Sequence, residues 1–312
     1  MPTLINTKTL NSFLAQLNLP EENSHKGDNG KLLIIGGSQL FHAASRWSLE
    51  VASKLVDMVF YASIPENNRL IQEAKQNFWN GIVISRSTIE NYIQEADCVL
   101  IGPGMERDEV DPNYQQQPTS FYLANPPSES DWSLKTQKVV NYLLAKYPAK
   151  KWVIDAGALQ MMDGRLLNEN CIITPHSQEL ARLLTSLNLD SSALVANKLD
   201  DLSDQLNQAT VLLKGPIDSI IHRGQVYKIA GGNPGLTKGG TGDVLAGLLA
   251  GLYATNDLLP VAIIASYVNK TAGDLLHQTN GPFYNATDLV EAIPQVLWKL
   301  IKKTDENLKT QE

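Results

Sequence analysis

The chain has 312 residues, of which 43% are hydrophobic and 19% charged, and its formal net charge is −7. This composition is typical of a soluble globular protein with a sizeable core, and the lack of a basic block argues against a nucleic-acid-binding surface. The start of the sequence has no basic segment followed by an apolar one, and the apolar runs are too short or too interrupted to cross a bilayer. We therefore expect a cytoplasmic protein without membrane contact.

Two cysteines, Cys98 and Cys171, each lie inside an apolar run. Their spacing is not that of a metal site, so we expect both to be small buried side chains in a reducing compartment.

Apolar runs alternate with helical patterns along most of the chain. Helical spacing covers Ala43–Leu55, and the expected strands are Lys31–Ile35, Met58–Ala62, Gly81–Ser85, Cys98–Ile101, Trp152–Asp155, Cys171–Thr174 and Thr210–Leu213. Continuous apolar strands between helices predict an α/β, doubly wound and mostly parallel sheet flanked by helices. We expect a single domain over residues 1–312.

The pattern changes after Lys214. Ser219–His222 and Gln225–Ile229 flank Arg223-Gly224, which predicts a β-hairpin. Two helical segments, Val244–Ala254 and Pro260–His277, are expected to finish the fold, and the charged residues 302–312 are expected to form a flexible tail.

Residues 106–131 interrupt this alternation. The segment is rich in Pro, Gln, Ser and Asn and has no apolar periodicity. Because strands and helices resume beyond it, we interpret it as a surface insertion rather than a domain linker.

The run from Gly231 to Asp243 contains six glycines and ends on a carboxylate at the start of an apolar helix. Glycines and a helix N-terminus together expose N–H groups that bind phosphate or the charge of a transferring phosphoryl group. An acid at such a site indicates proton transfer, although Asp243 could instead serve only as a helix N-cap.

Polar or glycine-rich residues also follow most of the expected strands. They are Gly36-Gly-Ser38, Gly102-Pro-Gly104, Asp155, Thr174-Pro-His176 and Lys214-Gly215. Each has an ordinary interpretation as a turn or a cap. Because ligands bind at the carboxyl ends of parallel strands, we expect them to share one rim opposite the glycine run.

These motifs, in this order and over residues 25 to 300, resemble the ADP- or ATP-dependent NAD(P)H-hydrate dehydratases of the ribokinase-like superfamily. The segment Asn233-Pro-Gly with Gly239-Gly-Thr-Gly-Asp243 carries the resemblance most specifically. The resemblance implies a metabolite repair reaction on the S-epimer of NADH-hydrate or NADPH-hydrate. The ring hydroxyl is phosphorylated by ADP or ATP, and phosphate is then eliminated to restore the reduced cofactor.

The resemblance also implies roles for individual residues. Asp243 would be the catalytic base, and the N–H groups of Gly240, Thr241 and Gly242 would stabilise the transferred group. Mg²⁺ would accompany the nucleotide, with Glu179 near the metal. The residues at the nucleotide would be Lys214, Gly215, Pro216, Ile217, Asp218, Asn233 and Gly242, and those at the hydrated nicotinamide would be Ala44, Gly104, His176 and Asp243.

The chain departs from the family pattern at several positions. Gly157 stands where a second acid is usual, Ser177-Gln178 replaces Pro-Gly, and Lys238 replaces a small residue. The roughly 25 residues before the first strand are too few for the epimerase domain that some members carry, so we expect a separate epimerase. The subunit assembly stays open, with a homo-oligomer possible.

Two other functions remain as alternatives. The first is a small-molecule kinase of the same superfamily, of the vitamin or thiazole-alcohol type, which would stop after phosphoryl transfer. The second is a nucleotide-binding relative without catalysis, which the glycine at position 157 favours and the presence of Lys214 and Asp243 disfavours.

Overall fold

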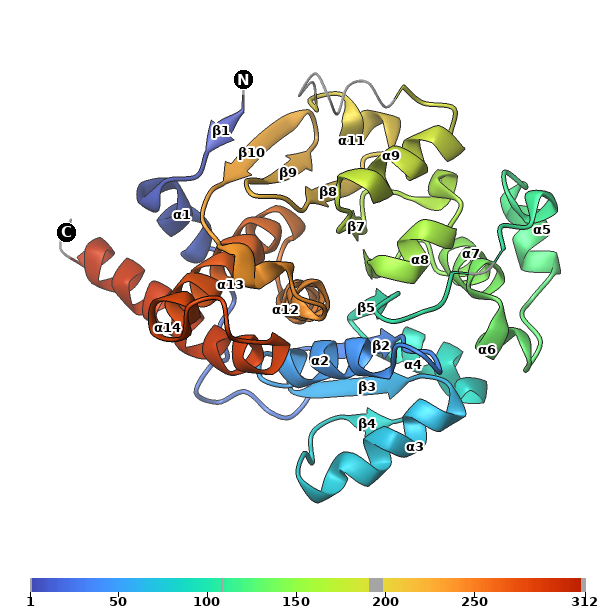
Figure 1. Ribbon diagram of the computed structural model, residues 1–312, viewed down its shortest axis with the longest axis horizontal. Helices are drawn as coiled ribbons and strands as arrows, with labels where there is room; N and C mark the ends of the chain where they lie inside the picture. Colours follow the sequence, from blue (N-terminus) through green and yellow to red (C-terminus); the bar gives the residue numbers. More distant parts are fainter. Residues whose placement is uncertain (1, 108, 191–198, 310–312) are drawn as a thin grey trace.

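A computed structural model describes residues 2–107, 109–190 and 199–309. Within them, ten strands form one sheet in the order β1-β10-β9-β8-β7-β6-β5-β2-β3-β4 (Figure 1). The strands are β1 Thr3–Leu4, β2 Lys31–Ile35, β3 Met58–Ala62, β4 Ile82–Val83, β5 Cys98–Ile101, β6 Lys151–Ile154, β7 Cys171–Ile173, β8 Thr210–Leu213, β9 Asp218–His222 and β10 Gln225–Ile229. Every strand expected from the sequence is present, although β4 is shorter than expected.

Most neighbouring strands are parallel, which confirms the predicted fold class. The antiparallel pairs are β8 with β9 and β9 with β10. The predicted hairpin turn between β9 and β10 has left-handed backbone at Arg223 (φ 45°) and Gly224 (φ 74°), as a tight two-residue connection requires.

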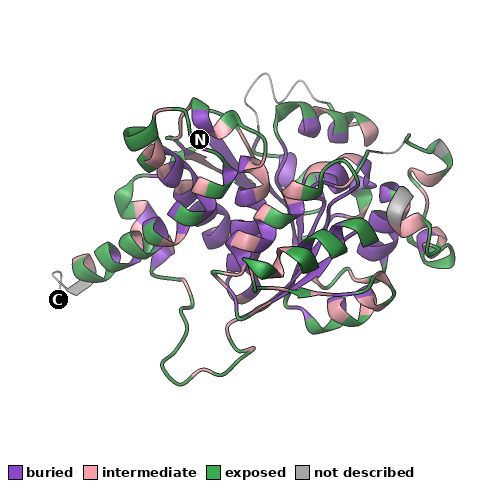
Figure 2. Ribbon diagram, turned by 60° about the horizontal axis from the view of Figure 1, so that its bottom comes forward, coloured by how far each residue is buried: buried purple, intermediate pink, exposed green. Residues whose placement is uncertain are grey.

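Helices cover both faces of the sheet. On β2, Leu32 and Ile34 belong to one apolar core, and Leu33 and Ile35 belong to the other. The first core contains α2 His42–Ala52, α12 Thr241–Thr255 and α13 Leu258–Asn280, whereas the second contains α4 Ile89–Glu95, α7 Thr136–Lys146, α8 Ala156–Met161 and α9 Ser177–Ser186 (Figure 1). Figure 2 shows the buried strands between these layers and exposed outer faces on the helices. Smaller helices are α3 Pro65–Glu73 and α11 Leu202–Gln205.

The C-terminal part of the chain is more helical than expected. A third long helix, α14 Ala286–Lys309, follows α13, so most of the expected flexible tail is helical. Its Thr304 is buried and donates from Oγ1 to the Asn11 side chain on α1 Thr7–Leu14 at 3.2 Å. The charged residues Lys302, Lys303, Asp305 and Glu306 of α14 are exposed, as on the outer face of an amphipathic helix. Residues 310–312 lie outside the described part of the chain.

The segment 106–131 is not without structure. It contains a 3₁₀ turn at Pro112–Tyr114, helix α5 Thr119–Ala124 and the first residue of α6 Asp131–Leu134. Tyr122 is buried and donates from its hydroxyl to Oδ2 of Asp163 at 2.7 Å. Because Tyr114, Phe121 and Tyr122 pack their rings together, a few aromatic residues hold an otherwise polar segment on the body.

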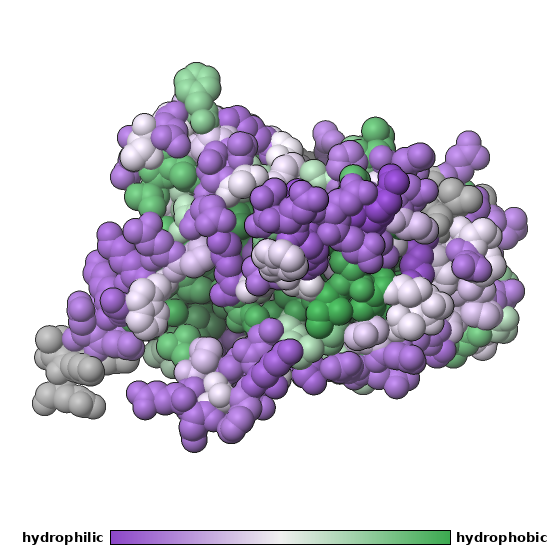
Figure 3. Space-filling view, turned by 90° about the horizontal axis from the view of Figure 1, so that it is seen from below, coloured by the Kyte–Doolittle hydropathy of each residue, from purple (hydrophilic) through white to green (hydrophobic). Residues whose placement is uncertain are grey.

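Strand β4 forms one edge of the sheet, and Leu70, Trp79 and Ile82 are exposed near it. Figure 3 views this side of the molecule and shows a band of apolar side chains bordered by polar ones. In the described part of the chain, no helix has the length and apolar character needed to span a membrane.

Candidate active site

The glycine run leads into the N-terminus of α12. Gly240 is the N-cap and has φ of 95°, a backbone conformation that favours glycine. A Cβ at this position would lie 2.4 Å from the ring of Trp47. Gly240 is therefore required both by the turn and by the close approach of α2.

The first turn of α12 consists of Thr241, Gly242 and Asp243. Thr241 is buried, and its hydroxyl donates to the carbonyls of Leu236 and Lys238 at 2.6 and 2.8 Å. Its N–H makes only a long hydrogen bond of 3.4 Å to Lys238. N–H groups in a first turn lack partners within their own helix, so the turn can bind an anion through its backbone while the Thr241 side chain holds the loop.

A cation lies beside this turn. The Nζ of Lys214 donates to Oδ1 of Asp155 at 3.0 Å, and a Cβ at Gly242 would lie 3.6 Å from the same Nζ. Asp155 is buried and also accepts from Thr174 Oγ1 at 2.7 Å. Burial disfavours the charged form of Lys214, but the negative charges of Asp155, Glu179 and Asp243 outweigh this effect and raise its pKa. Lys214 therefore stays protonated.

Asp243 has the electrostatics of a proton acceptor. Burial and then the negative charge of Asp155 raise its pKa to about 7, although Lys214 opposes the shift. A carboxylate with a pKa near neutrality can take a proton at physiological pH and release it again. Its chemistry is thus set by the residues that the strand ends β6 and β8 bring to α12.

Side chains of α13 hold the loop Lys214–Asp218, which is expected at the nucleotide. Asp218 is buried, accepts from Gly215 N at 2.9 Å and from Ser266 Oγ at 2.7 Å, and lies 3.3 Å from Nζ of Lys270. Lys270 also donates to the carbonyls of Gly215 and Pro216. The side chain of Asp218 therefore shapes the loop, while Ile217 is 53% exposed at its tip.

Asn233 and Lys238 anchor the glycine run. The Asn233 side chain accepts from Gly235 N at 2.9 Å and donates to Asp274 at 3.0 Å, and Asp274 also accepts from Gly232 N at 2.9 Å. Lys238 donates to the carbonyls of Pro282 and Tyr284. The expected nucleotide residue Asn233 thus has its polar atoms engaged within the protein, and Lys238 ties the loop to the segment before α14.

The expected nicotinamide residues Ala44 and Gly104 meet on the other wall. A Cβ at Gly104 would lie 3.0 Å from the Ala44 side chain and 3.2 Å from Cα of Gly37. Ser48, one turn after Ala44, donates to the carbonyl of Asp243 at 2.8 Å. This wall therefore joins the first turn of α12 directly.

His176 and Glu179 form a reciprocal cap on α9. The Glu179 N–H donates to His176 Nδ1 at 3.3 Å, and Oε2 of Glu179 accepts from His176 N at 2.9 Å. Oε1 of Glu179 accepts from Gln160 at 2.8 Å. His176 itself is exposed beside Lys214, with which it forms a parallel bridge.

The missing acid at position 157 has a steric explanation. A Cβ at Gly157 would lie 2.1 Å from the carbonyl oxygen of Met105. The chain leaving Gly104 therefore fills the space that a side chain would need. The backbone at Met105 thus explains why position 157 is a glycine in this chain and not the acid that is usual in the family.

Lys270 and Asp274 belong to the site but were not expected there from the sequence. Both lie on α13, one turn apart on a helix that is otherwise mostly buried, and together they hold the two loops of the site. A pair of charges at spacing four within an apolar helix was the available signal.

The family model for NAD(P)H-hydrate dehydratase matches residues 32–295. The bifunctional NAD(P)H-hydrate repair enzyme of Methanocaldococcus jannaschii is 32% identical over 291 residues, or 91% of this chain and 51% of that protein. The chain spans about half the length of the first curated relatives that it matches. The ADP-dependent (S)-NAD(P)H-hydrate dehydratase of Cenarchaeum symbiosum is 29% identical, covering 88% of this chain and 90% of that protein.

Solved structures share the fold. A ribokinase-like superfamily protein from Enterococcus faecalis has a TM-score of 0.76 at 22% identity, covering 96% of both chains. A Bacillus subtilis ADP/ATP-dependent NAD(P)H-hydrate dehydratase, co-crystallised with ATP and Mg²⁺, has a TM-score of 0.70 at 21% identity, covering 96% of this chain and 99% of that one. With a matching family model over most of its length and the site geometry described above, this chain belongs to the NAD(P)H-hydrate dehydratase family.

Proposed function

We propose that this protein uses ADP or ATP to dehydrate the S-epimer of hydrated NADH or NADPH. The observation that carries the proposal is Asp243, whose pKa is raised to about 7 in the first turn of α12, beside the Lys214–Asp155 pair. A helix turn that can bind a phosphoryl group through its N–H groups thus carries a base and lies beside a cation. The relative from Cenarchaeum symbiosum is named an ADP-dependent (S)-NAD(P)H-hydrate dehydratase, which supports the proposal.

In the proposed mechanism the hydroxyl oxygen of the substrate ring attacks the terminal phosphorus of the nucleotide, and Asp243 accepts the hydroxyl proton. The bond from that phosphorus to the bridging oxygen breaks, and the shortened nucleotide leaves. The first-turn N–H groups and the Lys214 ammonium stabilise the phosphoryl oxygens during transfer. The C–O bond then breaks with its electron pair on phosphate, and loss of a proton from the adjacent ring carbon restores the double bond.

The nucleotide is proposed to lie along the Lys214–Asp218 loop and Gly242, with Asn233 acting through the shape of the glycine run. Among the described residues there is no group of three or more His, Cys, Asp or Glu side chains placed to hold one metal ion. This fits Mg²⁺ that arrives bound to nucleotide phosphates and keeps several waters. Glu179 is the proposed residue near that ion, and the ion would supply charge neutralisation on the phosphates.

The hydrated nicotinamide is proposed to lie against Ala44, Gly104 and His176. Epimerisation of the R-form is expected from a second catalytic unit. The relative from Methanocaldococcus jannaschii is named a bifunctional repair enzyme. Both cysteines are buried free thiols, which supports a reducing, cytoplasmic location. Assembly into a homo-oligomer remains a proposal to be tested by light scattering.

The test is incubation with enzymatically prepared NADH-hydrate, Mg²⁺ and either ADP or ATP. We expect recovery of the absorbance of NADH together with one phosphate released for each NADH formed. Formation of a stable phosphorylated product without recovery would instead identify a kinase. Nucleotide binding without either product would identify a non-catalytic relative.

A further inference from the structure

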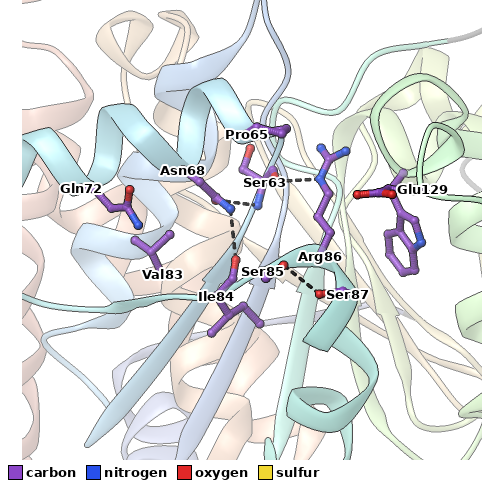
Figure 4. A pocket seen from close by; sticks show the side chains of 11 residues that line it. Ser63, Pro65, Asn68, Gln72, Val83, Ile84, Ser85, Arg86, Ser87 and Glu129 are labelled. Carbon is purple, nitrogen blue, oxygen red and sulfur yellow. Dashed lines mark hydrogen bonds between the residues drawn. The ribbon is translucent and has the colours of Figure 1, made fainter.

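A cavity of about 690 Å³ lies beside the proposed substrate wall and is lined by residues outside the expected site. Its lining comes from α3, from β4 with the turn that follows it, and from the insertion, which contributes Glu129 (Figure 4). Trp132, in the short helix α6 directly after the insertion, completes the lining. The volume lies in the range of about 300–1,000 Å³ that is usual for small-molecule sites.

The cavity lies close to the proposed nicotinamide site. A second, small cavity of about 20 Å³ shares Ser63, Arg86 and Trp132 with the large one and is also lined by Gly37 and Met105. Gly37 packs against Gly104, which in turn packs against Ala44. A molecule whose reacting ring lies at Ala44 and Asp243 would pass Gly37 to reach the large cavity.

Arg86 lies at the junction of the two cavities. Its Nε donates to the Ser63 carbonyl at 2.7 Å. Burial lowers its pKa to about 10, with Glu66 opposing the shift, so the guanidinium remains charged at neutral pH. The N–H groups of Gly36 and Gly37 already donate to the carbonyls of Ala62 and Pro103. A phosphate passing this point would thus meet a cationic side chain rather than a backbone cradle.

The chemistry of the large cavity suits a nucleoside. Trp132 offers a flat apolar face, and Val83 and Ile84 add apolar surface. Gln72 and Glu129 are exposed polar residues, and Figure 4 shows them on opposite sides of the cavity. An adenine has π-faces for stacking and polar edges, and a carboxylate is a usual acceptor for ribose hydroxyls.

We propose that this cavity is the subsite for the adenosine half of the hydrated dinucleotide. Trp132 stacks on the adenine, Glu129 accepts hydrogen bonds from the ribose hydroxyls, and Arg86 contacts the pyrophosphate. The proposal rests on the function proposed above and deepens it. It makes the insertion 106–131 a substrate-binding element of this chain, because that segment supplies Glu129 and leads into Trp132.

The test compares two substrates that share the reacting ring. NADH-hydrate carries the adenosine half, whereas the hydrate of reduced nicotinamide mononucleotide lacks it. In Trp132→Ala we expect KM for NADH-hydrate to rise about tenfold or more, because stacking on an aromatic side chain is lost. The value of kcat and the KM for the mononucleotide hydrate should stay unchanged. Gln72→Trp, which fills the cavity from α3, should produce the same selective effect.

Trp298→Ala is the matched control, because this partly exposed tryptophan lies on α14. Equal changes for both substrates, or no change in either cavity variant, would overturn the subsite. Thermal unfolding of each variant identifies any loss of folding, and Glu129→Gln then tests the same cavity from an exposed position.

Failure of the proposed function would give a different result: the wild-type protein would convert neither hydrate back to its reduced nicotinamide. The cavity is then probed by calorimetry with ADP-ribose, with the donor site saturated by a non-hydrolysable ATP analogue. Binding that weakens in Trp132→Ala, but not in Trp298→Ala, supports an adenosine subsite. No binding, or equal binding in both variants, overturns it.

Discussion

Lys214 places its Nζ 3.0 Å from Oδ1 of the buried Asp155. The two residues follow β8 and β6, the strands on either side of β7, and both lie beside the first turn of α12. Asp155 raises the pKa of Asp243 and Lys214 lowers it, so the pair adjusts the proposed base from outside its own helix. One ion pair at the carboxyl ends of these strands thus supplies a positive charge to the proposed phosphoryl site and also affects the protonation of Asp243.

Removing the Lys214 ammonium should lower the free energy of unfolding. In Lys214→Met, Asp155 loses its partner while buried, so we expect a loss of about 3–5 kcal/mol in the free energy of unfolding. The double variant Lys214→Met/Asp155→Asn should regain most of this loss because no unpaired charge remains. Denaturant unfolding of both variants measures the difference, and equal stabilities would contradict a pair held by charge.

Replacing the proposed base should separate chemistry from binding. We expect Asp243→Asn to lower kcat by about 10²–10⁴, the usual contribution of a general base, while the Kd for ADP stays within a few-fold. Single-turnover kinetics and calorimetry measure the two quantities. The control is Asp305→Asn on an exposed position of α14, and turnover at the control's level in Asp243→Asn would remove Asp243 from the mechanism.

The pH dependence of turnover follows from the same residue. Because the pKa of Asp243 is raised to about 7, its carboxylate form is populated only as pH rises through that value. We therefore expect kcat/KM to increase with pH between about 6 and 8, with a slope of one on the acid side. Asp243→Asn should lack this limb in its residual activity. A wild-type profile that is flat across the range would argue that Asp243 is not the titrating group.

Two adjacent glycines before α12 differ in whether a side chain would fit: Gly240 leaves no room for one, and Gly239 does. Gly240 has φ of 95°, and a Cβ there would lie 2.4 Å from the Trp47 ring, whereas Gly239 has nothing within 4 Å. We expect Gly240→Ala to lose at least the roughly 1–2 kcal/mol of left-handed strain and most of its turnover. Gly239→Ala should remain close to wild type in thermal unfolding and in kcat. Equal behaviour of the two variants would contradict this account of the turn.

Much of the sheet was predictable because its strands are continuous apolar runs, and β2, β3, β5, β8 and β10 have the expected bounds. The long helix α14 was missed because its charged residues resemble a tail until Thr304 is placed against Asn11 of α1. The convergence of Asp155 and Lys214 followed from the rule for strand ends, but Lys270 and Arg86 did not. Their partners lie on segments distant in sequence, which no local pattern records.

Position 157 tests whether the missing acid of the family can be restored. Any Cβ there would lie 2.1 Å from the carbonyl oxygen of Met105, so the obstacle is the first side-chain atom and not the carboxylate. We expect Gly157→Ala and Gly157→Asp to lower the melting temperature similarly, by several degrees, since overpacking in a closed site costs about 1–3 kcal/mol. Because Met105 lines the small cavity that leads to Arg86, both variants should also raise KM for NADH-hydrate. If the aspartate variant alone is destabilised, electrostatic repulsion near Asp155 is the cause, and the steric explanation for the glycine fails.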